Sequence, residues 1–199
     1  MTDPRRRQIL RTLPPGGTNV VAQFRGRWSE QQNRDITAML TTGGVRRHGL
    51  GIVTATDGAE LTDLRGSSPD AGWMDGLPEP AEWPLLDRLD LSYADLDAFQ
   101  LSRVRMRDCR LTRARLGQFV NGAFERCDFS GVTIERGLIL AQFTDCRFVG
   151  ADLRGATIGD RFVRCDFSAA DLTGAAFDGA AQECVFDACK TDDRTRLPS

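Results

Sequence analysis

Six cysteines offer the most versatile chemistry in this chain of 199 residues. Thiolates form disulfides, bind zinc and act as nucleophiles, and each use requires its own spacing or environment. Cys127, Cys146, Cys165 and Cys184 recur every nineteen residues, and Cys109 precedes them. Zinc sites instead contain close pairs such as C-x-x-C together with a second pair or with histidines. The regular spacing therefore indicates small buried packing positions, with metal or redox use as the less favoured alternative.

Residues suited to catalysis are scarce. His48 is the only histidine and Lys190 the only lysine, so neither a triad of histidine ligands nor a G-x-x-x-x-G-K-[ST] phosphate loop can form. The sequence also contains no G-x-S-x-G elbow and no complete G-x-G-x-x-G. His48 follows two arginines and precedes a glycine, which favours a solvated loop. We therefore predict a protein that is not an enzyme, with no catalytic residue, no cofactor and no metal.

One cluster of charge is suited to binding a partner. Six arginines fall within thirteen residues, opposed only by Asp108. An acidic protein, a phosphate group or RNA would fit such a patch, and ordinary solvated surface is the alternative reading. Exposed aromatic residues that would stack on bases are missing beside it, so we expect no direct binding of DNA. The candidate partner-binding residues are Arg103, Arg105, Arg107, Arg110, Arg113 and Arg115.

Composition excludes several other classes of protein. The net charge is −2, which favours neither nucleic acid nor a membrane surface. No apolar run reaches the roughly 18 residues typical of a transmembrane helix. Arg5, Arg6 and Arg7 are not followed by an apolar segment of the kind that signal peptides contain. We expect a cytoplasmic protein, and the abundance of arginine, alanine, glycine and aspartate suggests a bacterial genome rich in GC.

The elements that position these side chains must form a repeat, because a period of five lies inside the nineteen-residue unit. A large apolar residue, here called the central residue, recurs at each step, and a small or apolar residue lies two positions before it. Asp often stands directly before the central residue, as in the A-D-L-R-G and A-D-L-T-G stretches. Successive central residues include Leu91, Leu96, Leu101, Met106, Leu111, Leu116, Phe124, Phe129, Ile134, Ile139, Phe143, Phe148, Leu153, Ile158, Phe162, Phe167, Leu172 and Phe177.

This period matches neither an α-helix nor a simple strand, whose side chains repeat about every 3.6 and 2 residues. It requires a chain that turns a corner every five residues, so that four corners make one square coil. Two residues of each five would point inward and three would face water. Stacked coils would pair as parallel ladders about 4.8 Å apart.

The pattern over residues 85–190 resembles the pentapeptide-repeat family, whose motif is A-(D/N)-L-x-x. The resemblance implies an all-β solenoid, a right-handed quadrilateral β-helix of about five coils. Some bacterial members mimic duplex DNA and bind DNA gyrase, but mimicry needs a strongly negative rod. Residues 85–190 carry 16 acidic and 14 basic residues. We therefore expect a scaffold for protein–protein interaction. Its partner is unknown, and the arginine cluster would fit an acidic protein. Binding of DNA gyrase is the alternative, and the sequence leaves room for a dimer.

Two departures from the family pattern predict local irregularities. Coils of nineteen residues rather than twenty leave one side a residue short, which predicts a tight corner there. Asp160 occupies an inward position that Gly122 and Ala141 take in earlier coils, and we expect its carboxylate to reach solvent.

The first 84 residues show no five-residue pattern and are predicted to cap the first coil, with an independent small α/β module as the alternative. Ser29 and Gln32 form an S-x-x-Q capping box, which predicts a helix near residues 29–41. Residues 65–84 are rich in Gly and Pro and read as a linker. Residues 191–199 are predicted to form a C-terminal tail.

Overall fold

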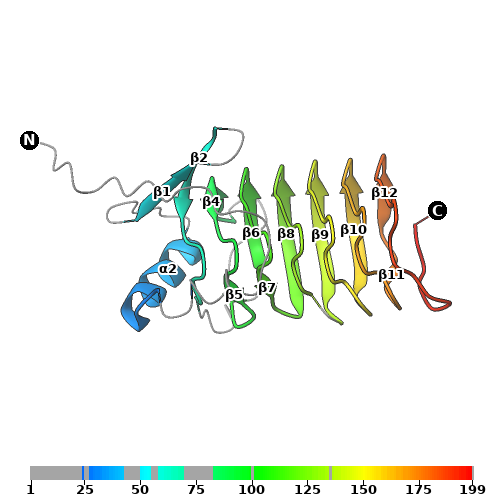
Figure 1. Cartoon of the computed structure of the whole chain (residues 1–199), viewed down its shortest axis with the longest axis horizontal. Coiled ribbons are helices and arrows are strands. Elements are labelled where there is room, and N and C mark those ends of the chain that lie inside the picture. The colour runs from blue at the N-terminus through cyan, green and yellow to red at the C-terminus, as the bar shows by residue number, and fades with distance from the viewer. Residues whose placement is uncertain are drawn as a thin grey trace, which may run out of the picture.

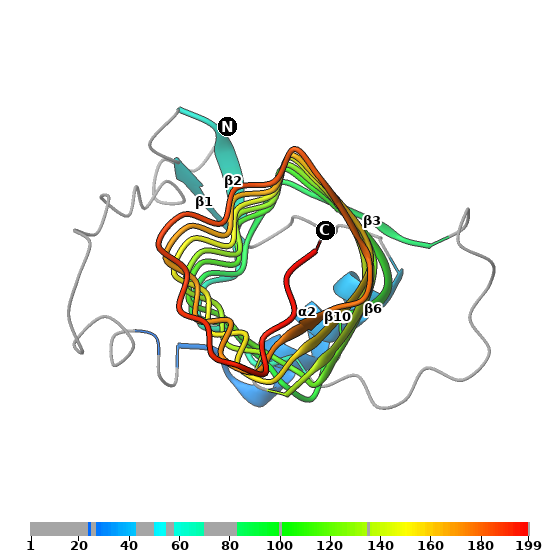
Figure 2. The same cartoon turned by 90° about the vertical axis from the view of Figure 1, so that its right-hand side faces the viewer.

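The computed structural model describes residues 24, 27–42, 50–54, 58–69, 83–99, 101–134 and 136–198. These residues form a rod of stacked coils with one helix, α2 (Glu30–Thr42), at its N-terminal end (Figure 1). Viewed along the rod, successive coils superpose and enclose a four-sided outline (Figure 2). The predicted all-β solenoid of about five coils, with a small mixed N-terminal segment, is confirmed.

Parallel pairing between coils holds the rod together. The largest sheet has the order β11-β10-β9-β8-β6-β3, with β12 beside β10. A smaller sheet joins β5 (Asp95–Leu96) to β7 (Arg115–Leu116). The strands of the largest sheet are β3 (Leu85–Asp87), β6 (Ser102–Arg107), β8 (Phe119–Glu125), β9 (Leu138–Thr144), β10 (Thr157–Val163), β11 (Ala176–Phe177) and β12 (Ala180–Gln182).

The pairing assigns the central residues to four sides, each with one residue per coil. The first side contains Met106, Phe124, Phe143 and Phe162, which pair in register. The second side contains Phe129, Phe148 and Phe167, which stack with centroids 5.0 and 4.8 Å apart. Rings of the first side meet rings of the second edge to face, as Phe143 meets Phe148 at 5.1 Å. Two interlocked ladders of phenylalanine therefore fill the interior, and Phe148 is buried between Phe129 and Phe167.

The short side of each coil is straight, so the predicted tight corner is wrong. Ile139 on the fourth side and Phe143 on the first side are both buried and are four residues apart. An even spacing keeps both side chains on one face of an extended strand, so β9 runs across both sides without turning. Two coils earlier, at β6, Leu101 and Met106 are five residues apart, and Arg103 with φ 55° forms a bulge between them. The missing residue removes the corner and leaves a flat side (Figure 2).

Asp160 reaches solvent as predicted. Its backbone has φ 70° and the residue is exposed. Gly159 before it is buried beside the outward side chain of Leu140. The next coil accommodates this irregularity with another glycine. A Cβ on Gly179 would lie 2.4 Å from the carbonyl oxygen of Asp160, so only glycine fits there.

The N-terminal helix begins at the predicted capping box. The amide of Ser29 donates to Gln32 Oε1, and the amide of Gln32 donates to Ser29 Oγ. Ile36 and Leu40 lie in one apolar cluster with Leu64 and with the central residues of the coils. The helix therefore covers the apolar interior at the N-terminal end of the rod (Figure 1).

A further five-residue unit lies ahead of the predicted repeat. The segment Thr62–Gly66 reads T-D-L-R-G, and β2 (Glu60–Asp63) pairs in parallel with β4 (Leu89–Asp90). On its other edge β2 pairs with β1 (Gly51–Thr54) in antiparallel fashion. Gly66 has φ 68°, at the corner position that Gly131 and Gly150 occupy in later coils. The expectation that no such unit precedes residue 85 is therefore wrong, because an incomplete coil already starts the stack.

Candidate protein interaction surface

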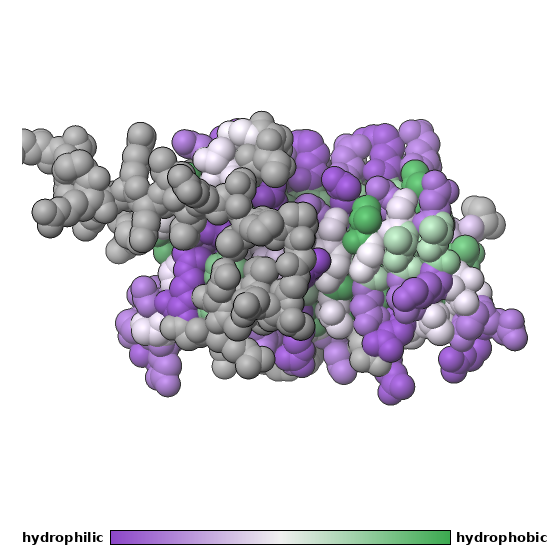
Figure 3. Space-filling model, in the orientation of Figure 1, coloured by the Kyte–Doolittle hydropathy of each residue, from purple (hydrophilic) through white to green (hydrophobic). Residues whose placement is uncertain are grey.

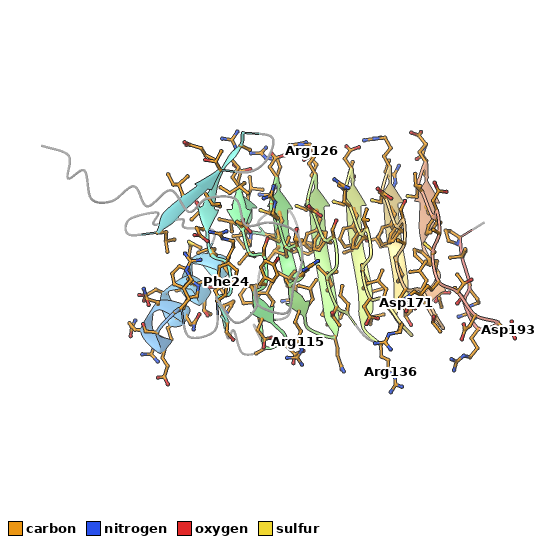
Figure 4. The ribbon with its side chains drawn as sticks, viewed as in Figure 1. Phe24, Arg115, Arg126, Arg136, Asp171 and Asp193 are labelled. Carbon is orange, nitrogen blue, oxygen red and sulfur yellow. The ribbon has the colours of Figure 1, made fainter. Side chains whose placement is uncertain are left out.

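The six candidate arginines lie on one coil but on three of its sides. Arg105 and Arg107 flank the central residue of β6 on the first side. Arg110 precedes the central residue of the second side, and Arg115 precedes that of the third. Arg113 occupies the corner between those two sides with φ 56°. Figure 4 places Arg115 at the lower edge of the rod, opposite the upper edge marked by Arg126. A flat partner could therefore contact only part of this set.

Carboxylates of the preceding coil bind two of these arginines. Arg107 Nε donates to Asp87 Oδ1 at 3.0 Å. Arg115 donates to Asp97 Oδ2 at 2.8 Å and lies 3.4 Å from Asp95. Arg105 Nε instead donates to the carbonyl oxygen of Trp83. The positive charge of the coil is thus partly neutralised within the protein.

Charge alternates from coil to coil along the corner between the first and second sides. The residues there have φ between 50° and 55°. Arg126 binds Asp108 through two hydrogen bonds of 2.7 and 3.0 Å, and Arg164 binds Asp145 through two of 2.6 and 2.9 Å. These hydrogen bonds hold the pKa of both carboxyl groups below the usual value. The column is Arg88, Asp108, Arg126, Asp145, Arg164 and Glu183.

A second column of alternating charge stands two residues further along each coil. Its residues bridge one another in parallel register. The buried cysteines separate the two columns, so the sequence reads D-C-R, R-C-D, D-C-R and R-C-D in successive coils. We call the two columns together the charge ladder. The sequence analysis missed it, although the inverted triplets were a readable signal. The second column is Asp90, Arg110, Asp128, Arg147, Asp166 and Val185.

The cysteines between these columns are packed as thiols. Cys146 Sγ donates to the carbonyl oxygens of Phe124 and Thr144, and Cys165 Sγ donates to those of Phe143 and Val163. Burial raises the pKa of the Cys127 thiol. Cys184, at the open end of the stack, is only half-buried. Among the described residues, no cluster of His, Cys, Asp or Glu could hold a metal ion.

A buried ionic cluster joins the incomplete first coil to the segment before α2. Arg27 and Arg65 each bind Asp63 through two hydrogen bonds, and Asp63 is 1% exposed. Trp28 Nε1 donates to the carbonyl oxygen of Arg65 at 2.9 Å. Phe24 stacks on Tyr93 with centroids 5.4 Å apart. Arg27 and Arg65 also lie over the ring of Phe24, so contacts within the protein link the cluster together at the N-terminal end of the rod.

The flat side carries a second candidate surface, which the sequence analysis also missed. We define the flat face as the outward side chains of β8, β9 and β10. Strand β9 contributes Leu138 and Leu140, which are 38% and 40% exposed, and it bears no charge. Phe119 of β8 is half-buried beside them. By contrast, the upper and lower edges of the rod are mainly hydrophilic (Figure 3). Strand β9 has apolar residues at outward as well as inward positions, and this sequence pattern could have indicated an apolar outer surface.

The five-residue units wind into four-sided coils, which is the fold that the resemblance to pentapeptide-repeat proteins implies. No protein-family model and no curated protein matches it. A trypsin-treated variant of QnrB1, a plasmid-mediated fluoroquinolone resistance protein, aligns over 64% of this chain with 18% identity and a TM-score of 0.36. The aligned part is 66% of that structure, so this chain spans just under two thirds of its length.

Two other solved structures show a comparable likeness. Full-length QnrB1 aligns over 66% of this chain and 92% of its own, with 16% identity and a TM-score of 0.31. The pentapeptide repeat protein Rfr23 from the cyanobacterium Cyanothece 51142 aligns over 68% of this chain and 90% of its own, with 14% identity and a TM-score of 0.29. These alignments leave the partner of this chain open. Within the described residues, no helix is long and apolar enough to cross a membrane.

Proposed function

We propose that this chain is a non-enzymatic scaffold for protein–protein interaction in the bacterial cytoplasm. The observation that carries the proposal is the filled interior. Phe124, Phe143 and Phe162 stack on the first side at 4.8 and 4.9 Å, and the rings of the second side close the remaining space. Such packing leaves no room for a substrate between the sides. The part of the rod that a partner can contact is therefore its outer surface. The phenylalanine ladders beneath that surface hold its side chains in fixed positions.

The charge ladder argues for a protein partner rather than for duplex mimicry. A mimic of DNA would carry rows of negative charge like those of the phosphates. Here Asp108 and Asp145 are each covered by an arginine of the following coil, at the corner where a continuous acidic row would otherwise form. Binding of DNA gyrase by mimicry stays the alternative, and it rests on the family resemblance.

The candidate arginines supply the test of an acidic partner. We choose Arg105, Arg110 and Arg113, because none of the three forms an ion pair with a described residue, unlike Arg107 and Arg115. A triple Arg→Ser variant should lose a captured partner, and rising salt should release that partner from the wild type. Exposed charges are screened over about 8–10 Å at physiological ionic strength. Unchanged affinity in the variant would move the docking site away from this coil.

Two assays separate the scaffold from the alternatives. Affinity capture from the source bacterium, followed by titration of the purified partner, should give a saturable complex with defined stoichiometry. Failure to capture any stoichiometric protein would contradict the scaffold. A supercoiling assay with purified DNA gyrase tests the alternative directly. Inhibition or protection of gyrase by the wild type would favour the alternative over a scaffold for another acidic protein.

A further inference from the structure

The flat face is an unusual surface for a parallel sheet. Parallel sheets are normally covered on both faces, because their strands are apolar on both sides. The inner face of β9 is covered by the phenylalanine ladders, whereas its outer face presents Leu138 and Leu140. The neighbouring outward positions are also uncharged or small, with Ala123 on β8 and Thr157 on β10. The flat face is thus apolar and uncharged at its centre, as the buried centres of protein interfaces are, but it is exposed to solvent.

Charges on and beside the face are arranged in opposite order on the two sides of β9. Towards the N-terminal end, β6 carries Arg105 and β8 carries Glu125. Towards the C-terminal end, β10 carries Arg161, and the acids Asp160 and Asp178 lie on β10 and just after β11. Reversing the rod would therefore place Arg161 diagonally across from Glu125, and Arg105 diagonally across from Asp178, with each pair offset by about two residues along the strands. Such antisymmetry about a central strand is what a self-complementary surface requires.

We propose that two copies of this chain associate through their flat faces, with the rods antiparallel and a two-fold axis running along β9. Rotation about such an axis keeps the strand direction, so Leu138 and Leu140 of one copy meet the same residues of the other. Strand β8 then faces β10, which sets Glu125 of one copy diagonally across from Arg161 of the other. Strand β6 faces β11 and β12, which sets Arg105 diagonally across from Asp178. Two packed sheets lie about 10 Å apart, a distance that leucine and arginine side chains bridge.

The size of the face sets the expected strength. The flat face together with the strands that flank it, β6 and β12, spans at most seven residues at about 3.3 Å by five strands at about 4.8 Å, which is roughly 23 by 24 Å, or about 550 Å² per copy. Stable interfaces commonly bury about 800 Å² per partner. We therefore expect a dimer that dissociates on dilution. This association does not depend on whether another protein docks on the arginine coil.

The oligomeric state of the full chain is measured by sedimentation equilibrium over a range of concentrations. The wild type should show a monomer–dimer equilibrium. Leu140→Arg places two like charges across the axis and should raise the dimer Kd at least about tenfold, which corresponds to about 1.4 kcal/mol. Val185→Arg is the matched control, because Val185 is similarly exposed at 42% but lies on the second side of the last coil. Circular dichroism melting should show both variants folded.

A charge exchange tests the proposed geometry. Arg161→Glu should weaken the dimer because it lies diagonally across from Glu125 of the other copy. Adding Glu125→Arg should restore the wild-type Kd, since the pair is then reversed rather than broken. A wild type that stays monomeric at every concentration would overturn the proposal. So would a dimer that Val185→Arg disrupts and Leu140→Arg does not, because association would then occur through the end coil. Failure of the double exchange to restore the dimer would reject the antiparallel arrangement.

Discussion

Asp63 of β2 lies in register beside Asp90 of β4, and the two buried carboxyl groups have pKa values shifted in opposite directions. Burial alone would raise both. Hydrogen bonds from Arg65 and Arg27 outweigh burial at Asp63 and lower its pKa to about 2. At Asp90, burial outweighs the hydrogen bonds from Ser92, and the pKa is raised. Two neighbouring aspartates of one repeat position thus contribute to stability with opposite dependence on pH.

The same substitution at these two positions should therefore have different effects at neutral pH. Asp63→Asn leaves buried Arg65 and part-buried Arg27 without their carboxylate and should destabilise the protein by about 3 kcal/mol. Asp90→Asn removes a poorly solvated charge and should change stability little or increase it. Urea unfolding of both variants beside the wild type measures the difference. Equal losses would show that the ionic cluster does not control the pKa of Asp63.

Stability of the wild type should follow pH accordingly. The folded-state pKa of Asp63 lies below its unfolded value of 3.8, so its stabilising effect is present above that value. The effect, of up to about 2 kcal/mol, should be lost as pH falls from about 4 to about 2. Protonation of Asp90 favours the folded state, and Asp90→Asn should remove this opposing contribution. Unfolding free energies across this range, compared between the wild type and Asp63→Asn, provide the check.

Phe148→Ala should destabilise the rod by about 3–5 kcal/mol. The ring is 1% exposed and stacks on both Phe129 and Phe167, so its removal leaves a cavity that rigid neighbouring coils cannot close. Val185→Ala, at an exposed position, should cost less than about 1 kcal/mol. Denaturant unfolding measures both, and a loss under about 1 kcal/mol for Phe148→Ala would contradict continuous packing of the ladder.

Two glycines at equivalent corners should tolerate alanine differently. Gly66 and Gly150 have φ of 68° and 65°, so alanine at either is strained by about 1 kcal/mol. A Cβ at Gly150 meets nothing within 4 Å, whereas one at Gly66 would lie 2.3 Å from the Cβ of Phe24. Gly66→Ala should therefore cost about 3 kcal/mol, because overpacking adds to the strain. Similar melting temperatures for the two variants would mean that Phe24 does not press on this corner.

The cysteine column should be reduced and slow to react. Cys127 and Cys146 are buried and packed against backbone, whereas Cys184 and Cys189 are only half-buried in the last coil. A thiol reagent added to the native protein should modify the last two first, and the others only on unfolding. Mass spectrometry of digested samples locates the label. Rapid labelling of Cys146, or a stoichiometric bound metal, would show that the column is reactive.

Much of the fold was predictable because the repeat is dense in the later coils. Central phenylalanines such as Phe148 stand at fixed steps, and a capping box announced the start of α2. The straight side was misread, because a missing residue suggested a tighter turn. The even step from Ile139 to Phe143 instead allows the chain to stay extended.

The surface was less predictable, since each outward side chain is shaped by the coil before it. Sequence spacing placed Arg107 and Arg115 outward, but their carboxylate partners lie eighteen to twenty residues upstream. The unit Thr62–Gly66 was not predicted as part of the repeat, because it stands alone and is separated from the later units. A single five-residue match has little weight without neighbours at the same step.

The charge ladder makes each coil differ from its neighbours and resemble the coil two steps away, a distinction that the backbone does not make. Neighbouring coils follow similar paths, yet Asp108 and Arg126 show that they carry opposite charges at the same corner. Deleting residues 126–144 would place Asp145 directly on Asp108, with two like charges at one corner. Deleting residues 126–163 would place Arg164 there and preserve attraction. A lineage of such rods should therefore grow or shrink by two coils at a time, with the pair of coils as its heritable unit.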